Sequence, residues 1–128
     1  MKTQDQHFLQ LNDITCYKIA YHLSNYIWAI VITWDYFTKD TAGKQLVRAT
    51  DSISANIAEG FGRFFKKDKV KFYRYAAGSL KEVNDWIHKS KDRKLIATEQ
   101  YNYIFQELEK LQKEINSLTK YTNLKLKI

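Results

Sequence analysis

The chain has 128 residues, no proline, only four glycines and a formal net charge of +7. This length fits one domain, and a composition rich in helix-forming residues excludes a turn-rich β fold and favours an all-α protein. The only cysteine, Cys16, excludes an intramolecular disulfide, and the longest apolar stretch, residues 26–34, is about half the length that spans a bilayer. We therefore expect a cytoplasmic protein without a membrane partner.

Apolar residues at three- and four-residue spacing predict two helices in the first half of the chain. The first covers about residues 13–34, with Asp13 as its N-cap. Its predicted stripe is Ile14, Tyr17, Tyr21, Ser24, Trp28 and Val31. The second covers about residues 41–60, and Gly60 and Gly62 signal its end. Its predicted stripe is Leu46, Ala49, Ile53 and Ile57.

Two longer helices are predicted in the second half. The third covers about residues 68–91 after a cap at Asp68, and the fourth covers about residues 98–120 after a cap at Thr98. On the third helix, the predicted buried arc is Phe72, Tyr73, Ala76, Leu80, Val83 and Ile87. On the fourth, the predicted stripe is Tyr101, Ile104, Leu108, Leu111, Ile115 and Leu118.

The helix order and the short links between helices predict the architecture. Connections of roughly five to eight residues suit antiparallel neighbours, so we expect a single domain over residues 1–128 that folds as an up-down-up-down four-helix bundle. Nineteen aromatic residues are many for such a core. The half-apolar second flank of the third helix predicts that the bundle also associates with itself.

The positive charge is concentrated in the middle of the chain. Residues 44–94 carry thirteen cations and six anions, whereas residues 1–43 carry three cations and four anions. Six cations are predicted to bind nucleic acid: Arg63, Lys66, Lys67, Lys71, Arg74 and Lys81. Cations at this spacing can follow the phosphates of a nucleic acid. Solubility alone does not require the cluster, because the same charges spread evenly over the chain would serve it equally well. The opposing interpretation, a merely solvated face, applies to any single lysine.

The aromatic residues beside these cations have two interpretations. Phe72 and Tyr73 are expected in the core, so they are not predicted to stack on bases. Phe61, Phe64 and Phe65 fit either a stacking surface or a subunit contact.

Polar residues on the second and third helices form an unusual set. Arg48, Ser52 and Glu59 fall on one side of the second helix, Asn56 borders its apolar stripe, and Glu82 lies on the third helix. We expect these five residues to form a structural polar network that fixes helix register or a subunit interface, because buried polar groups need partners. A catalytic carboxylate pair is disfavoured, because no nucleophile or base accompanies it.

The segments RATDSISANIAEGFGR and YRYAAGSLKEVNDWI resemble a family of small four-helix bundles encoded in intervening sequences of bacterial large-subunit ribosomal RNA genes. The matching positions are Arg48, Ala49, Ser52, Ile53, Asn56, Ile57, Ala58, Glu59, Gly60, Arg63, Ala76, Gly78, Ser79 and Glu82. The chain departs from the family at YFTKDTAGKQL, where a proline-containing turn is usual. The resemblance implies a homo-oligomeric ring, often a pentamer, with a basic character that suggests nucleic-acid binding. Similar proteins also serve as accessory subunits of retroelement reverse transcriptases.

Sites for a metal or another cofactor are not predicted. Asp85 and His88 have the spacing of one half of a di-iron motif, but such a site needs two of these motifs and two further glutamates. The glycines of the Gly60-Phe61-Gly62 segment follow no strand and lack the lysine and hydroxyl of a phosphate loop.

These observations favour a non-enzymatic, ring-forming bundle that binds structured RNA or DNA through its basic surface without base specificity. The alternative is a protein-interaction scaffold, or an accessory subunit for a nucleic-acid enzyme such as a reverse transcriptase.

Overall fold

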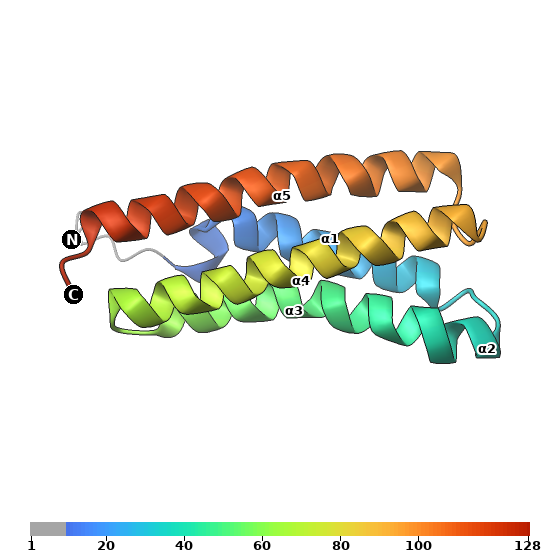
Figure 1. The fold of residues 1–128 in the computed structure, drawn as a ribbon, viewed down its shortest axis with the longest axis horizontal. Helices are drawn as coiled ribbons and strands as arrows, with labels where there is room; N and C mark the ends of the chain where they lie inside the picture. The colour runs from blue at the N-terminus through green and yellow to red at the C-terminus, as the bar shows by residue number, and fades with distance from the viewer. Residues whose placement is uncertain (1–9) are drawn as a thin grey trace.

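A computed structural model describes residues 10–128, and every regular element in that range is helical (Figure 1). The four long helices are α1 (Thr15–Val31), α3 (Lys44–Gly62), α4 (Lys66–Asp92) and α5 (Thr98–Lys125). Three short elements accompany them: η1 (Leu11–Asp13) before α1, and α2 (Tyr36–Thr38) with the π-helical turn η2 (Lys39–Gly43) before α3. The predicted all-α class is confirmed.

The long helices run alternately up and down. In Figure 1, α1 and α4 run in one direction while α3 and α5 return, so each helix is antiparallel to the next. α3 packs against α1 and α4, and α5 packs against the same two helices, which places the four helices at the corners of a square. This is the predicted four-helix bundle.

The core lies between the four helices and follows the predicted stripes closely on α3 and α5. Leu46, Ala49, Ile53 and Ile57 of α3 are all buried, as are four of the six positions predicted on the fourth helix. On α4, five of the six predicted positions are buried. Phe72 is the exception, because its ring lies beside the core rather than in it.

The stripe predicted for α1 is only half right. Its buried residues include Cys16, Ala20, Leu23 and Ile27, whereas Tyr21 and Trp28 are about half exposed, at 48% and 53%. Of the six predicted positions, only Ile14, Ser24 and Val31 are buried. Two apolar stripes run along this helix, and the smaller side chains face the core because the bundle interior has little room for large aromatic rings.

The predicted caps are also wrong, while the helices they introduce lie close to where the sequence placed them. α1 begins after Ile14, and the Asp13 carboxylate instead accepts the Gln10 N–H at 2.8 Å in η1. α4 begins after Phe65, so Asp68 lies inside its first turn. α5 begins after Ala97, whose N–H donates to Gln100 Oε1 at 2.8 Å, and this helix continues to Lys125.

The segment that departs from the family pattern is helical. Asp35 caps α2 by accepting the Thr38 N–H at 2.9 Å, and the chain passes through η2 directly into α3. Helical structure therefore begins at Tyr36, before the helix predicted from residue 41, and continues into α3. At the end of η2, Gly43 is buried against Val31 and Trp34, and a Cβ at this position would stand 2.8 Å from Val31 Cγ1.

Gly60 has a packing role rather than the terminating role predicted for it. It lies inside α3 and is buried where α3 meets α4. A Cβ on Gly60 would stand 2.7 Å from Tyr73 Cε1 and 3.0 Å from the Lys69 carbonyl oxygen. Only a residue without a side chain allows this approach.

Gly60→Ala is therefore expected to destabilise the bundle by about 1–3 kcal/mol, the range for overpacking a tight contact, because the Lys69 carbonyl belongs to the backbone and cannot turn away. Gly78→Ala is the matched control, because a Cβ at this exposed position in α4 meets no atom within 4 Å. That change should stabilise the helix by roughly 0.5–1 kcal/mol. Urea unfolding of both variants measures the difference, and equal stabilities would contradict this account of Gly60.

Candidate nucleic-acid interface

Most of the predicted binding cations lie where α3 ends and α4 begins. After Gly62 the chain turns through three residues and re-enters a helix at Lys66. The end of the chain closes this turn, because the Lys66 N–H donates to the Ile128 carbonyl at 2.7 Å and Lys66 Nζ lies 3.3 Å from the Asn123 carbonyl oxygen. The last turn of α5 is thereby held against the first turn of α4.

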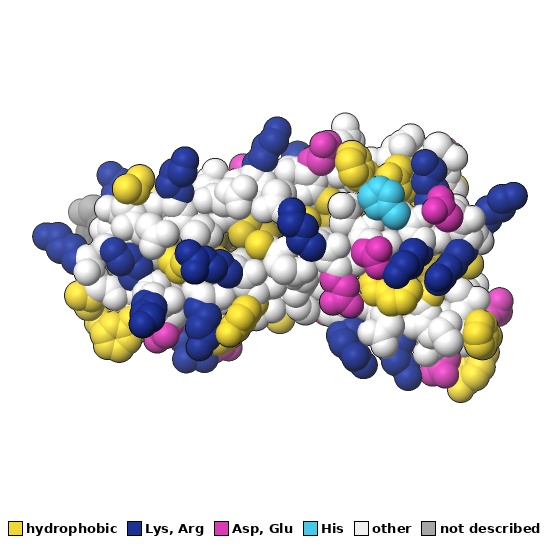
Figure 2. Space-filling view, in the orientation of Figure 1, with side chains coloured by type: hydrophobic (Ala, Val, Ile, Leu, Met, Phe, Trp, Pro, Cys, Tyr) yellow, Lys and Arg dark blue, Asp and Glu magenta, His cyan; other side chains and the backbone are white. Residues whose placement is uncertain are grey.

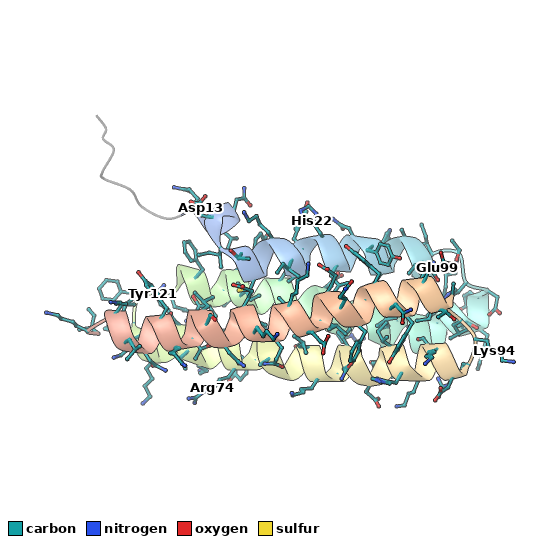
Figure 3. The ribbon with its side chains drawn as sticks, turned by 90° about the horizontal axis from the view of Figure 1, so that it is seen from above. Asp13, His22, Arg74, Lys94, Glu99 and Tyr121 are labelled. Carbon is teal, nitrogen blue, oxygen red and sulfur yellow. The ribbon has the colours of Figure 1, made fainter. Side chains whose placement is uncertain are left out.

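A surface depression of about 560 Å³ lies at this junction, and we call it the basic hollow. Four of the six predicted cations line it together with one residue of α5: Lys66, Lys67, Lys71, Arg74 and Asn123. Figure 3 shows Arg74 pointing outward from α4. In Figure 2, Lys and Arg side chains gather over the N-terminal half of α4, on the left, and most acidic side chains in that view lie towards the right.

The cations of the basic hollow are poorly compensated. Among residues 10–128, no ion pair involves Lys66, Lys67, Lys71 or Arg74. Among residues 10–128, the only acidic side chain that lines the hollow is Asp68. Uncompensated cations that line one hollow create a positive potential that attracts phosphate groups.

The other predicted cations have different surroundings. The Arg63 guanidinium pairs with Glu59, with Nη2 and Oε2 2.7 Å apart and Nε donating to the same oxygen at 2.9 Å. Lys81 lies nearly two turns beyond Arg74 on α4, and its Nζ is 3.5 Å from Gln112 Oε1. The structure therefore brings four of the six cations into one hollow, leaves Arg63 beside it and separates Lys81.

Lys69, in the middle of the basic run, turns inward. Its Nζ donates to the Phe61 carbonyl at 2.7 Å and lies 5.5 Å from the centre of the Phe61 ring. Burial lowers the pKa of this amine. Lys69 thus satisfies the free carbonyls at the end of α3, a role that cations commonly take at helix C-termini.

Of the aromatic rings beside the hollow, Phe72 was predicted wrongly. Phe72 was predicted to be buried, but the Arg63 guanidinium lies 4.6 Å from the centre of its ring and Lys71 Nζ lies 5.7 Å from it on the bundle's exterior. Phe64 and Phe65 are exposed in the turn and pack edge to face, while Phe61 packs against the core. Tyr75 lines the hollow and is half exposed.

A model of one protein family matches most of the chain. The family is described as "23S rRNA-intervening sequence protein", and the match covers residues 12–117. The chain belongs to the 23S rRNA-intervening sequence protein family. This agrees with the resemblance seen in the second and third predicted helices.

A solved structure shows the same fold as this intervening sequence protein. It is a crystal structure from Bacteroides thetaiotaomicron, described as a protein of unknown function from the S23 ribosomal protein family. The two chains are 21% identical and superpose with a TM-score of 0.73, over 82% of this chain and 98% of the other. No relative with a curated function matches the chain significantly.

The residues of the predicted polar network are only partly linked in this intervening sequence protein. Ser52 Oγ of α3 bonds to Ser79 Oγ of α4, and Asn56 Nδ2 donates to the Ser52 carbonyl at 2.8 Å. Glu59 pairs with Arg63 instead, and Glu82 accepts a 3.4 Å bond from Trp86 Nε1. Across residues 10–128, no hydrogen bond joins Arg48, Glu59 or Glu82 to the serines. The connection between helices comes from Ser79, which the family motif includes.

Asp85 and His88, considered above for metal binding, have other partners. Asp85 pairs with Lys89 at 2.7 Å. His88 Nδ1 lies 2.7 Å from the Asn84 carbonyl, so Nδ1 carries the proton and Nε2 accepts the Tyr101 hydroxyl at 3.1 Å. Within the described part of the chain, no group of three or more His, Cys, Asp or Glu residues stands close enough to hold a metal ion.

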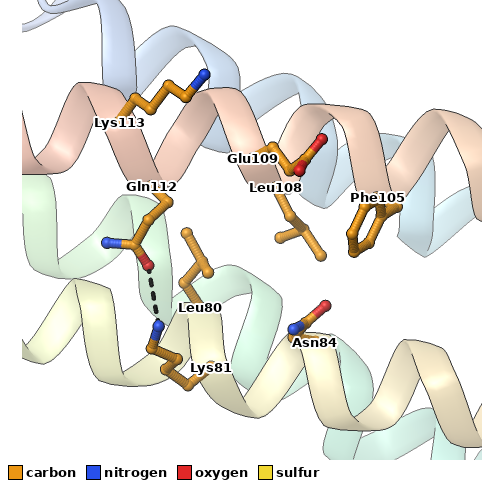
Figure 4. Close-up of a pocket in the computed structure, with 8 residues that line it drawn as sticks. All are labelled: Leu80, Lys81, Asn84, Phe105, Leu108, Glu109, Gln112 and Lys113. Carbon is orange, nitrogen blue, oxygen red and sulfur yellow. Dashed lines mark hydrogen bonds between the residues drawn. The ribbon is translucent and has the colours of Figure 1, made fainter.

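A second depression lies further along α4 and α5 (Figure 4), and we call it the central hollow. Leu80, Leu108 and Phe105 form its apolar part, and the Lys81–Gln112 hydrogen bond crosses its rim. Asn84 Oδ1 is buried at its edge and has no hydrogen-bond partner among residues 10–128.

Within the same range, no helix is long and apolar enough to cross a membrane.

Proposed function

We propose that this protein is a non-enzymatic, ring-forming helical bundle that binds structured RNA or DNA through the phosphate backbone. The observation that carries the proposal is the basic hollow, which is lined by Lys66 and by the exposed side chains of Lys67, Lys71 and Arg74. Asp68 is the one acidic side chain that lines it among residues 10–128. Binding through phosphates needs no particular base sequence, so we expect little sequence preference. The family name supports a connection with ribosomal RNA genes.

The surroundings of the reactive side chains support a non-enzymatic role. Cys16 is buried, and burial together with the Glu114 carboxylate raises the pKa of its thiol to about 12, which disfavours the thiolate that a nucleophile needs. Both ring nitrogens of His88 are engaged in hydrogen bonds. The carboxylate of Glu59 is neutralised by Arg63, just after the end of α3, and that of Asp85 by Lys89 on α4.

The outer face of α1 supports self-association. Lys18 is the only charged residue of this helix, and Tyr21, Trp28 and Ile32 are each about half exposed. Their spacing of seven and four residues places the three side chains on one face. An exposed apolar stripe of this kind is typical of a protein contact. A second copy on this face would build the ring, which the family resemblance predicts to be a pentamer.

The test is a fluorescence-anisotropy titration of a labelled structured RNA and a labelled DNA duplex across a salt series, with the oligomer mass measured on the same sample. We expect submicromolar binding that weakens steeply with salt, because each neutralised phosphate releases counterions. No binding at low salt by an intact oligomer would overturn the proposal. The protein-scaffold alternative would then lead, because Tyr36 and Phe37 are strongly exposed at the other end of the bundle.

A further inference from the structure

The basic hollow contains a feature that binding to a phosphate backbone does not use. The ring of Tyr75 lines the hollow together with Lys71 and Arg74, and half of its surface is open to solvent. Its hydroxyl has no hydrogen-bond partner among the described residues. A large apolar ring left open between cations has a face available for stacking.

The orientation of the Tyr75 ring is supported from behind. Phe72 packs against it edge to face, with ring centres 5.4 Å apart and planes at 85°. Phe72 is in turn held by the Arg63 guanidinium, whose Cζ lies 4.6 Å from the centre of its ring, and Arg63 is fixed by the ion pair with Glu59. This chain of contacts runs from the end of α3 to the hollow, so Tyr75 is ordered before any ligand arrives and loses little side-chain entropy on binding.

The cations that line the hollow with Tyr75 can hold the phosphates next to a stacked base. Lys67, Lys71 and Arg74 lie at i, i+4 and i+7 on one face of α4, and Tyr75 follows Lys71 by one turn. Asn123 reaches the hollow from α5 and supplies an amide with both donors and an acceptor. An aromatic ring within a positively charged groove is the arrangement that binds unpaired nucleotides.

We propose that the basic hollow holds an unpaired nucleotide, with the base stacked on Tyr75 and the flanking phosphates held by Lys67, Lys71 and Arg74. The site therefore prefers single-stranded nucleic acid, or the unpaired positions of a structured RNA, over a continuous duplex, whose base faces are hidden by stacking. This inference rests on the proposed function and specifies the form of nucleic acid that the same site takes.

The experiment compares a labelled oligonucleotide without internal complementarity with the blunt duplex made from the same strand, in RNA and DNA versions. The wild-type chain should bind the single strand more tightly than the duplex. Tyr75→Ala should weaken single-strand binding by about 5- to 150-fold, the range expected for losing one base–aromatic stack, and should change duplex binding less than twofold. Tyr75→Phe keeps the ring and should bind as the wild type does.

The matched control is Tyr121→Ala, which removes a similarly exposed tyrosine of α5 that does not line the hollow. This variant should bind both probes normally, and circular dichroism checks that all variants fold. Equal weakening of single-strand and duplex binding by Tyr75→Ala, or no weakening at all, would overturn the stacking inference while leaving phosphate binding in place. A wild-type chain that binds neither probe at low salt would overturn the proposed function as well.

Discussion

Replacing Lys67, Lys71 and Arg74 together with glutamate is expected to abolish nucleic-acid binding while the oligomer stays intact. The change turns three of the four cations of the basic hollow into anions and leaves only Lys66 to oppose Asp68. Each lost phosphate contact should also reduce the slope of log K against log salt by about one. Single neutral substitutions are therefore informative too, since each should reduce this slope by about one. The measurement is the anisotropy titration across the salt series, with oligomer mass determined in parallel.

A charge-matched control separates a local effect from a general one. Lys39 of η2, Lys91 of the last turn of α4 and Arg93, which follows that helix, are exposed. The α2–η2 segment and the end of α4 lie at the opposite end of the bundle from the start of α4 (Figure 1). Replacing these three residues with glutamate changes the net charge by the same amount but leaves the hollow untouched. If both triple variants lose binding equally, net charge and not the hollow governs affinity, and our assignment of the site is wrong.

Alkaline pH is expected to unfold the bundle through two buried groups. Burial, with a contribution from Glu114, raises the pKa of the Cys16 thiol from 9.0 to about 12. Burial, with a contribution from Cys16, raises the pKa of the Tyr73 hydroxyl from 10.0 to about 12. Both groups ionise at lower pH in the unfolded chain than in the folded one. Their contribution to stability is therefore complete below about pH 9 and is lost as pH rises towards 12.

The expected loss is large for a domain of this size. One pKa unit corresponds to about 1.4 kcal/mol. By pH 12, the free energy of unfolding has therefore fallen by about 4 kcal/mol through Cys16 and by about 3 kcal/mol through Tyr73. The sum is comparable to the whole stability of a typical domain, which is about 5–15 kcal/mol. Urea unfolding at a series of pH values between 8 and 11 measures the slope.

Tyr73→Phe supplies the control for the alkaline prediction. The variant keeps the buried ring but removes the hydroxyl that ionises, so its stability should fall less steeply with pH than that of the wild type. Cys16→Ala should flatten the curve further, although it also leaves a small cavity. A wild-type stability that does not change up to pH 11 would contradict the burial of both groups.

The sequence predicted the architecture well because the side chains that a helix buries recur every three or four residues along it. On α3, the narrow stripe from Leu46 to Ile57 contains all four predicted core positions, since the other faces of that helix are mostly polar or small. On α1, two apolar stripes compete, and periodicity alone cannot tell that Leu23 and Ile27 turn inward while Trp28 turns outward. That choice depends on the space between the other three helices, which no local pattern contains.

The candidate site was predictable in part for a similar reason. Spacing along α4 placed Lys67, Lys71 and Arg74 on one face, and the structure places them in one hollow. Asn123 could not have been added from the sequence, because it lies about fifty residues away and reaches the hollow only through the antiparallel return of α5. The inward turn of Lys69 depends on carbonyls left free at the end of α3, so it too required the three-dimensional arrangement.

The uncompensated cations of the basic hollow have an energetic consequence for the fold itself. Lys66, Lys67, Lys71 and Arg74 repel one another when α4 forms, and within the described part of the chain Asp68 is the only acidic side chain that lines the hollow. Dissolved ions screen this repulsion over a distance of about 10 Å at 0.1 M salt, so the folded state gains from the same ions that compete with a bound phosphate chain. Higher ionic strength therefore stabilises the unbound bundle and at the same time lowers its affinity for nucleic acid.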